Sequence, residues 1–276
     1  MKVATIRVGD GSTRAVRIDG DVAIEIPGVA DVGELLATVG LDGARSATGT
    51  AHPVAALDFA PVVPHPSKIV CVGQNYKAHI AETHREPPQY PTLFAKFEDS
   101  LVGAHDDLVR PAESSLMDWE GELAIVIGRE IRRAVGAEAE AAIAGYTVAN
   151  DISFRDWQYR TTQWLQGKMW SASTPVGPVL ATPEELPFQA RIVTEVDGVV
   201  KQDGEIHDLV FGPVALIEYI STVTVLRPGD LILTGTPSGV GHVREPQERL
   251  EPGSVVSVEI DGIGRLVNRI VGDPIR

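Results

Sequence analysis

The chain has 276 residues, of which 43% are hydrophobic and 22% are charged, as in an ordinary globular protein. The formal net charge of -14 and the lack of a basic cluster argue against a nucleic-acid partner, because duplex binding needs a cationic face. No apolar run is long enough to cross a bilayer and no secretory signal is visible, so the sequence predicts a cytoplasmic protein without a membrane partner.

The first part of the chain has the pattern of short strands joined by tight turns. The turns are Gly9-Asp10-Gly11 and Asp19-Gly20, and Asp-Gly between alternating apolar residues is a hairpin signal. A short helix is predicted over residues 32–37, and prolines then punctuate the chain near residue 64. We therefore expect a small β-rich N-terminal domain over residues 1–64 and a larger domain over residues 65–276.

The larger part has many apolar runs of strand length and few helical stretches. Helices are predicted over residues 138–144, which are Ala-rich, and 213–223, which begin with Pro. Because strands and helices do not alternate, a doubly wound parallel sheet is rejected in favour of an α+β fold dominated by mixed, curved β-sheets. The strand-like runs cover residues 69–72, 93–97, 122–127, 146–149, 191–196, 230–233, 255–260 and 266–270.

Two glutamates two positions apart open one of these runs, at Glu120 and Glu122. In a strand such residues share a face, so their carboxylates would lie close together and repel each other. A bound cation would remove that cost. The alternative is an exposed strand start with both side chains in water, and neighbouring Asp118 is either an acceptor that supports the site or a turn residue.

A third carboxylate, Asp151, closes the later apolar run that ends in Asn150. Its alternative role is a helix N-cap or turn residue. If all three carboxylates converge, the ligands are purely oxygen, which selects Mg²⁺ or Mn²⁺, with Ca²⁺ possible, over zinc or copper. Three protein ligands would leave positions open for substrate and water, as a catalytic metal requires.

The ordered set of motifs resembles the fumarylacetoacetate hydrolase family over roughly residues 66–273. Each motif is weak alone, but the order is specific. The family's known folds imply a β-roll or pseudobarrel of curved sheets. The motifs that carry the resemblance are Val72-Gly73-Gln74-Asn75-Tyr76, Glu120-Gly121-Glu122, Asn150-Asp151, Arg155-Asp156-Trp157-Gln158, Gly167-Lys168, Thr174-Pro175-Val176-Gly177-Pro178 and Thr234-Gly235-Thr236-Pro237-Ser238-Gly239-Val240-Gly241.

The resemblance implies a role for each site residue and a homodimer as the assembly. A small keto acid would bind through its carboxylate and keto oxygens to a metal held by the three carboxylates. The implied residues are Glu120, Glu122 and Asp151 for the metal, Lys168 for the substrate carbonyl, His79 and Glu82 for water activation on a lid, and Arg155, Gln158 and Thr236 for substrate contact.

Physical chemistry allows these roles, and it also allows a purely structural or solvent-exposed role for each residue. His79 and Glu82 are one helical turn apart, so Glu82 could orient His79 as a general base, or both could be surface residues. Lys168 among apolar neighbours could stabilise an oxyanion or extend to solvent. Arg155 could bind a carboxylate or pair with Asp156.

Gln158 could equally contact only solvent. Met169-Trp170-Ser171 departs from the family pattern, which predicts an altered pocket wall, and Lys96 is a further pocket candidate.

The leading hypothesis is a metal-dependent hydrolase that cleaves a carbon–carbon bond in an acylpyruvate-like β-diketo acid. The alternative keeps the metal and the keto acid but expects decarboxylation or keto–enol isomerisation, of oxaloacetate or a hydroxymuconate-type diacid. A third hypothesis, a non-catalytic protein with a structural cation, is disfavoured by the presence of His79, Glu82 and Lys168.

Overall fold

The computed structural model describes residues 1–83 and 86–273. Within them the chain is mostly β, with one long mixed sheet, a five-stranded sheet and a two-stranded ribbon. The strands are β1 (Lys2–Arg7), β2 (Thr13–Asp19), β3 (Val22–Glu25), β4 (Ala51–Pro53), β5 (Asp58–Phe59), β6 (Ile69–Gly73), β7 (Thr92–Lys96), β8 (Leu101–Val102), β9 (Leu108–Arg110), β10 (Met117–Asp118), β11 (Gly121–Ile127), β12 (Ile143–Asn150), β13 (Ser153–Phe154), β14 (Thr174–Ala181), β15 (Arg191–Val196), β16 (Val199–Glu205), β17 (Leu231–Leu233), β18 (Val255–Ile260) and β19 (Gly264–Gly272).

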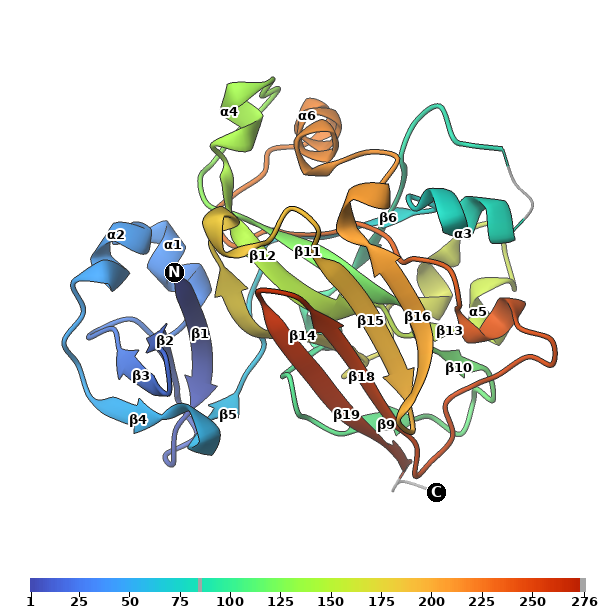
Figure 1. Ribbon diagram of the computed structural model, residues 1–276, viewed down its shortest axis with the longest axis horizontal. Helices are drawn as coiled ribbons and strands as arrows, with labels where there is room; N and C mark the ends of the chain where they lie inside the picture. Colours follow the sequence, from blue (N-terminus) through green and yellow to red (C-terminus); the bar gives the residue numbers. More distant parts are fainter. Residues whose placement is uncertain (84–85, 274–276) are drawn as a thin grey trace.

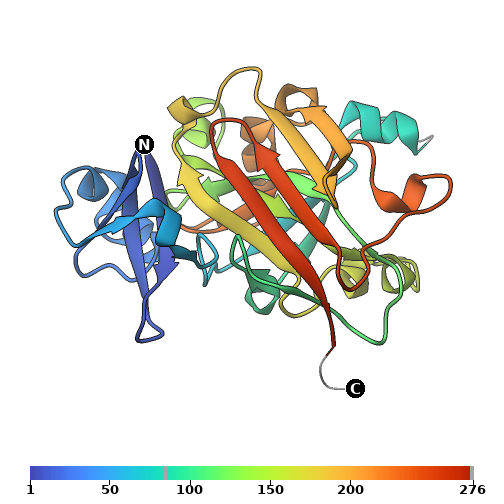
Figure 2. The ribbon, with the colours of Figure 1, turned by 60° about the horizontal axis from the view of Figure 1, so that its bottom comes forward.

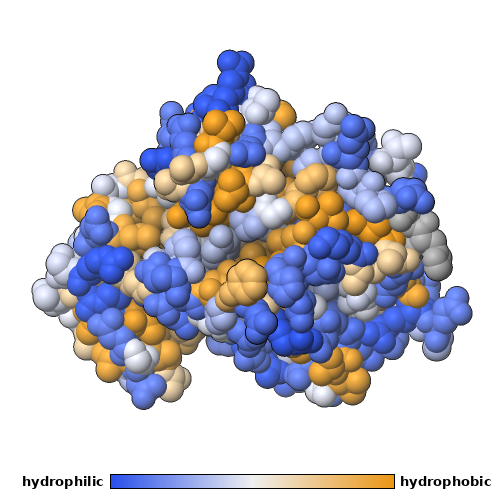
Figure 3. Space-filling view, turned by 45° about the horizontal axis from the view of Figure 1, so that its top comes forward, coloured by the Kyte–Doolittle hydropathy of each residue, from blue (hydrophilic) through white to orange (hydrophobic). Residues whose placement is uncertain are grey.

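Helices are few and short. Their bounds are α1 (Val32–Ala37), α2 (Gly40–Arg45), α3 (Lys77–Glu82), α4 (Ala137–Glu140), α5 (Arg155–Gln158) and α6 (Pro213–Val223), with 3-10 turns at Val54–Ala56, Glu98–Ser100, Trp164–Gly167, Pro183–Glu185, Ile206–Asp208 and Gly241–Val243. No helix in the described part of the chain is long and apolar enough to span a membrane. The face that carries α4 and α6 is a mosaic of hydrophilic and hydrophobic side chains (Figure 3).

The long sheet has the order β4-β3-β2-β1-β14-β12-β11-β17-β6-β7, with β5 beside β1 and β8 beside β14. Most pairs are antiparallel, and β17 with β6 is a parallel pair. The second sheet has the order β16-β15-β18-β19-β9. The predicted α+β class with mixed, mainly β-sheets is confirmed, and along the described strands the sheets do not close into a barrel.

The core lies on both faces of the long sheet (Figure 1). On β11, Leu123 packs in the cluster that includes Val258 of the five-stranded sheet. Ile125 packs in the cluster that includes Leu216 of α6. Strand β11 is buried along its whole length, so it forms a rigid base for the residues at its beginning.

The N-terminal strands β1–β5 lie together at one side of the molecule in both ribbon views (Figures 1 and 2). Strand β1 also pairs with β14, where Lys2 lies opposite Ala181 and Val3 opposite Leu180. The predicted division after residue 64 stays a prediction, because these strands continue the sheet of the larger part.

The predicted helices over 32–37 and 213–223 are confirmed as α1 and α6. The predicted helix over 138–144 is wrong in its second half, since α4 ends at Glu140 and β12 begins at Ile143. Ile143 pairs with Ile127 of β11, so the hydrogen bonds and packing of the central sheet override the helical propensity of the alanines.

Candidate active site

Three carboxylates meet where β11 begins and β12 ends. The antiparallel register places Gly121 opposite Asn150, and the backbone N–H of Asp151 donates to the carbonyl of Glu120 at 2.8 Å. Carboxylate oxygens of Glu120, Glu122 and Asp151 lie within 4.8 Å of one another, and all three residues are buried. The predicted convergence is therefore observed, and the alternative of a solvated strand start is wrong.

Three cations surround these carboxylates. The Nζ of Lys168 lies 2.8 Å from oxygens of both Glu120 and Asp151. Lys96 contacts Asp151 at 2.9 Å, and Arg155 contacts Glu120 at 2.7 Å. Lys96 does not line the cavity, so its position supports Asp151 rather than a pocket role.

Glu122 is the carboxylate of the group that has no ion pair among the described residues. Its oxygen accepts a hydrogen bond from the backbone N–H of Gly235 at 2.7 Å. Burial, with repulsion from Asp151 and Glu120, raises the pKa of Glu122 well above its usual range. Glu120 differs, since burial opposes its ionisation but the charges of Lys168 and Arg155 lower its pKa to about 2.

This arrangement fits a hard divalent cation. The possible ligand atoms are carboxylate oxygens that lie close enough together to bind one ion. Glu122, which has no cationic partner among the described residues, would gain one. A buried carboxylate without a compensating charge is costly, which a bound cation would relieve. The identity of the metal stays a prediction.

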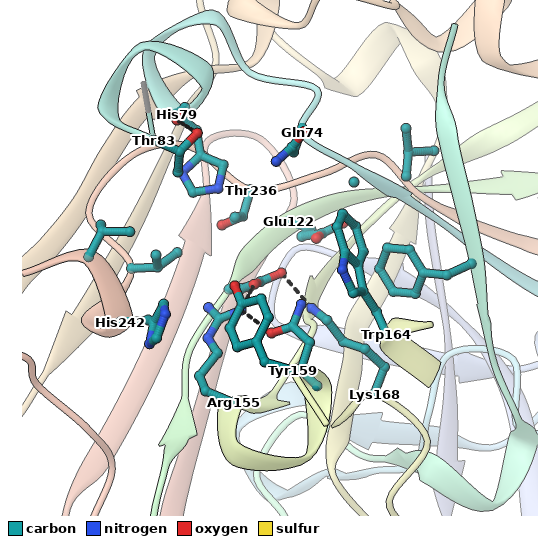
Figure 4. Close-up of a pocket in the computed structure, with 17 residues that line it drawn as sticks. Gln74, His79, Thr83, Glu122, Arg155, Tyr159, Trp164, Lys168, Thr236 and His242 are labelled. Carbon is teal, nitrogen blue, oxygen red and sulfur yellow. Dashed lines mark hydrogen bonds and ion pairs between the residues drawn. The ribbon is translucent and has the colours of Figure 1, made fainter. Parts of the chain in front are cut away.

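A cavity of about 70 Å³ opens above the carboxylates (Figure 4). The predicted residues His79, Arg155, Gln158, Lys168 and Thr236 all line it. Its other lining residues are Val72, Gly73, Gln74, Thr83, Phe94, Glu120, Glu122, Tyr159, Trp164, Val240, His242 and Val243.

The predicted His79–Glu82 pair lies on α3, one helical turn apart. The Nδ1 of His79 is 3.1 Å from an oxygen of Glu82, and the backbone N–H of Gly239 donates to Glu82 at 3.0 Å. Glu82 therefore joins α3 to the loop after β17. His79 points into the cavity (Figure 4), and within residues 1–83 and 86–273 its other ring nitrogen, Nε2, has no hydrogen-bond partner.

Arg155 does not pair with Asp156, contrary to the alternative considered for it. Its Nε donates to Asp118 at 2.8 Å, and Nη1 donates to Gln158 at 2.9 Å. Burial opposes the charge of Arg155, but the carboxylates of Asp118 and Glu120 raise its pKa further. The guanidinium is thus engaged by the protein itself, and Asp118 is a structural acceptor rather than a turn residue.

Thr236 is held by two hydrogen bonds, one donated to the carbonyl of Gly121 at 2.9 Å and one accepted from Gln202 at 2.7 Å. Gln202 also accepts from the backbone N–H of Gly121 at 3.0 Å. Sequence reasoning missed Gln202, which is 1% exposed, because it occurs on a hairpin strand with polar neighbours. The role of Gln202 becomes clear only once the positions of the strands are known.

Two aromatic side chains, which the sequence did not indicate, form part of the cavity wall. Trp164 packs edge-on against Phe94 with ring centroids 5.7 Å apart. Trp170 does not line the cavity; it packs against Phe154 and Trp157 at 4.8 and 5.1 Å. The prediction that Met169-Trp170-Ser171 forms an altered pocket wall is therefore wrong, because Trp170 packs in a separate aromatic cluster and Met169 and Ser171 are exposed.

Gly235 carries the N–H that binds Glu122, at φ +100. A Cβ there would lie 3.0 Å from the carbonyl oxygen of Val72 and from Cβ of Asn75. Gly235→Ala should therefore lower the free energy of unfolding by about 1–3 kcal/mol and weaken metal binding, measured by denaturant titration and calorimetry. Gly253→Ala is the matched control, since Gly253 has φ +101 and open space around it. Equal losses of stability in the two variants would contradict the role given to crowding.

The sequence is similar to known proteins. The family model described as fumarylacetoacetate (FAA) hydrolase C-terminal matches residues 68–271. The human protein named oxaloacetate tautomerase FAHD2A, mitochondrial, is 41% identical over 238 residues, which are 84% of this chain and 76% of that protein.

Solved structures have a similar fold. The structure of 2-hydroxyhepta-2,4-diene-1,7-dioate isomerase from Mycobacterium marinum has a TM-score of 0.82, 34% identity and 99% coverage of both chains. The structure of fumarylacetoacetate hydrolase from Exiguobacterium antarcticum has a TM-score of 0.87 and 30% identity, and covers 99% of this chain and 100% of that one.

Proposed function

Because the chain belongs to the fumarylacetoacetate hydrolase family, we propose that it is a divalent-metal-dependent keto–enol isomerase of a small 2-keto diacid of the oxaloacetate type. The observation that supports this most is the set of three buried carboxylates beside Lys168 in a cavity lined by His79. The similar proteins named as an oxaloacetate tautomerase and a dioate isomerase favour isomerisation over the carbon–carbon hydrolysis that the sequence first suggested.

Substrate binding would begin at the carboxylates. Glu120, Glu122 and Asp151 would hold Mg²⁺ or Mn²⁺, which when bound polarises the keto group and acidifies the neighbouring C–H. The Nζ of Lys168, 1% exposed, would add a positive charge beside the developing enolate oxygen. Burial opposes that charge, but Asp151 and Glu120 raise the pKa of Lys168, so it stays protonated at neutral pH.

Proton transfer is assigned to His79. Its Nε2 would take a proton from the carbon next to the keto group, and the protonated His79 would then return that proton to the enolate oxygen, which gives the enol and restores the neutral imidazole. Glu82, 3.1 Å from Nδ1, would fix the ring and stabilise its protonated form. Aromatic residues Phe94 and Trp164 would keep water from the reacting carbon.

We expect His79→Ala to lower kcat for oxaloacetate tautomerisation at least about 100-fold, because general acid–base catalysis typically contributes 10²–10⁴-fold. KM should change little, since substrate binding is assigned to other residues. Loss of enol absorbance, recorded with Mg²⁺ and again with chelator, measures this rate. Glu82→Gln should give a smaller loss, and unchanged turnover in His79→Ala would reject the assignment.

Hydrolysis is the second candidate, because the His79–Glu82 pair could also activate water. Mass-spectrometric product analysis with acetylpyruvate and oxaloacetate separates the reactions. Unchanged mass with tautomer interconversion supports the isomerase. Release of acetate and pyruvate would instead support the hydrolase, and CO₂ a decarboxylase.

A further inference from the structure

His242 lines the cavity but has no role in the proposed proton transfer. It lies in the 3-10 turn Gly241–Val243, after the glycine-rich loop. Its ring stacks on Tyr159, with centroids 5.2 Å apart and an interplanar angle of 29°. Both rings line the same cavity as the carboxylates.

The main chain fixes His242 relative to the carboxylates. Its backbone N–H donates to Asp118 at 3.0 Å, and the same oxygen accepts from Arg155 at 2.8 Å. Arg155 in turn contacts Glu120 at 2.7 Å. In Figure 4, His242 and Arg155 lie on one side of the cavity, and Trp164 and Lys168 lie on the other. A ligand bound at its keto end beside Lys168 can therefore extend toward His242.

The polar edges of this stacked pair are available to a ligand. Within residues 1–83 and 86–273, neither the imidazole of His242 nor the hydroxyl of Tyr159 has a hydrogen-bond partner. Burial, aided by the charge of Arg155, lowers the pKa of His242, so the ring is a neutral imidazole with one N–H to donate.

Arg155 cannot easily serve the far end of a diacid, because Asp118 and Glu120 already bind its guanidinium. Of the other cavity residues in this loop region, Val240 and Val243 are apolar, and the hydroxyl of Thr236 already donates to the carbonyl of Gly121. His242 is thus the polar side chain of this loop that faces the cavity with an unused donor. A carboxylate placed there would be the natural acceptor.

We propose that His242, stacked on Tyr159, is a specificity-determining residue that binds the distal carboxylate of a 2-keto diacid and so selects diacids over 2-keto monoacids. This inference rests on the proposed function for the keto end of the ligand. Tyr159 holds the imidazole in place, and the imidazole N–H supplies the hydrogen bond.

The test compares two ligands of equal length, 2-oxoadipate and 2-oxohexanoate, which differ in the distal carboxylate. Their dissociation constants would be measured by calorimetry with Mn²⁺ present, together with KM and kcat for oxaloacetate tautomerisation. His242→Phe keeps a ring for stacking but removes the donor, and His242→Gln keeps a donor. His65→Ala is the control, because the His65 side chain is 78% exposed and pairs with Glu98 at the surface.

The natural protein should bind the diacid at least about tenfold more tightly, as one hydrogen bond to a charged group provides. His242→Phe should reduce this ratio to about twofold and raise KM with little change in kcat, whereas His242→Gln should keep part of it and His65→Ala all of it. A ratio that persists in His242→Phe would overturn the inference, as would equal binding of both ligands by the natural protein.

These measurements distinguish failure of the His242 inference from failure of the proposed function. Diacid preference that depends on His242, without any tautomerisation, would reject the isomerase and support the binding role of His242. Metal-dependent tautomerisation whose KM is unchanged in His242→Phe would do the reverse.

Discussion

Glu122→Gln should remove metal-stimulated activity and, at the same time, stabilise the metal-free protein. Glu122 is buried next to two other carboxylates and has no ion pair in the described residues. A neutral amide removes the repulsion and can still accept from the N–H of Gly235. We expect the melting temperature in chelator to rise by a few degrees, since about 1 kcal/mol corresponds to roughly 2–4 °C at this size.

The same change removes one of three proposed metal ligands. The dissociation constant for Mn²⁺ should rise at least about 100-fold, more than the 10–100-fold typical of residues that only support a ligand. The increase in melting temperature that Mn²⁺ gives the natural protein should then disappear, because that increase follows the logarithm of metal concentration over its dissociation constant. Calorimetry and thermal melts with and without Mn²⁺ measure both effects.

Asp230→Asn provides the matched control, because Asp230 is another fully buried carboxylate. It pairs with Lys68 at 2.9 Å and accepts from the backbone N–H of Arg227 at 2.8 Å, away from the cavity. This variant should lose stability and keep its affinity for Mn²⁺. If Glu122→Gln also lost stability in chelator and kept its metal affinity, Glu122 would be a structural carboxylate and the metal site would be wrong.

The convergence of Glu120, Glu122 and Asp151 was predictable because it depends on local rules. The first two are two apart at a strand start, and the third follows the strand that pairs with it. His79 and Glu82 were assigned from the family resemblance, and their spacing of one helical turn explains why the two side chains meet. Local periodicity thus explains why these side chains meet, whereas the family resemblance assigned their roles.

The parts that were missed depend on long-range contacts. Gln202 holds Thr236, which is 34 positions away, and His242 stacks on Tyr159 from a distant loop. Neither contact leaves a periodic pattern in the sequence. The false helix near Ile143 has the same origin, because pairing with β11 decides its conformation and propensity does not.

Lys168→Met should lower kcat about 10²–10³-fold while metal affinity is kept or increased. Lys168 occupies the space between Glu120 and Asp151, 2.8 Å from an oxygen of each. Loss of its charge leaves the metal as the remaining cation proposed beside the enolate oxygen, and loss of one such group typically costs 10²–10³-fold in kcat. The two carboxylates, freed from the ammonium, would bind Mn²⁺ at least as well as before.

The stability of this variant should depend on the metal more than that of the natural protein does. Removing one partner of a buried ion pair costs about 3–5 kcal/mol, because the remaining charge is uncompensated. In chelator Lys168→Met should therefore melt well below the natural protein. Saturating Mn²⁺ should recover most of the difference, since the ion supplies the charge that the lysine gave.

Lys68→Met should lose stability at its pair with Asp230 without recovery by Mn²⁺. Equal recovery of both variants would mean that the ion acts elsewhere, and full activity of Lys168→Met would remove Lys168 from the reaction.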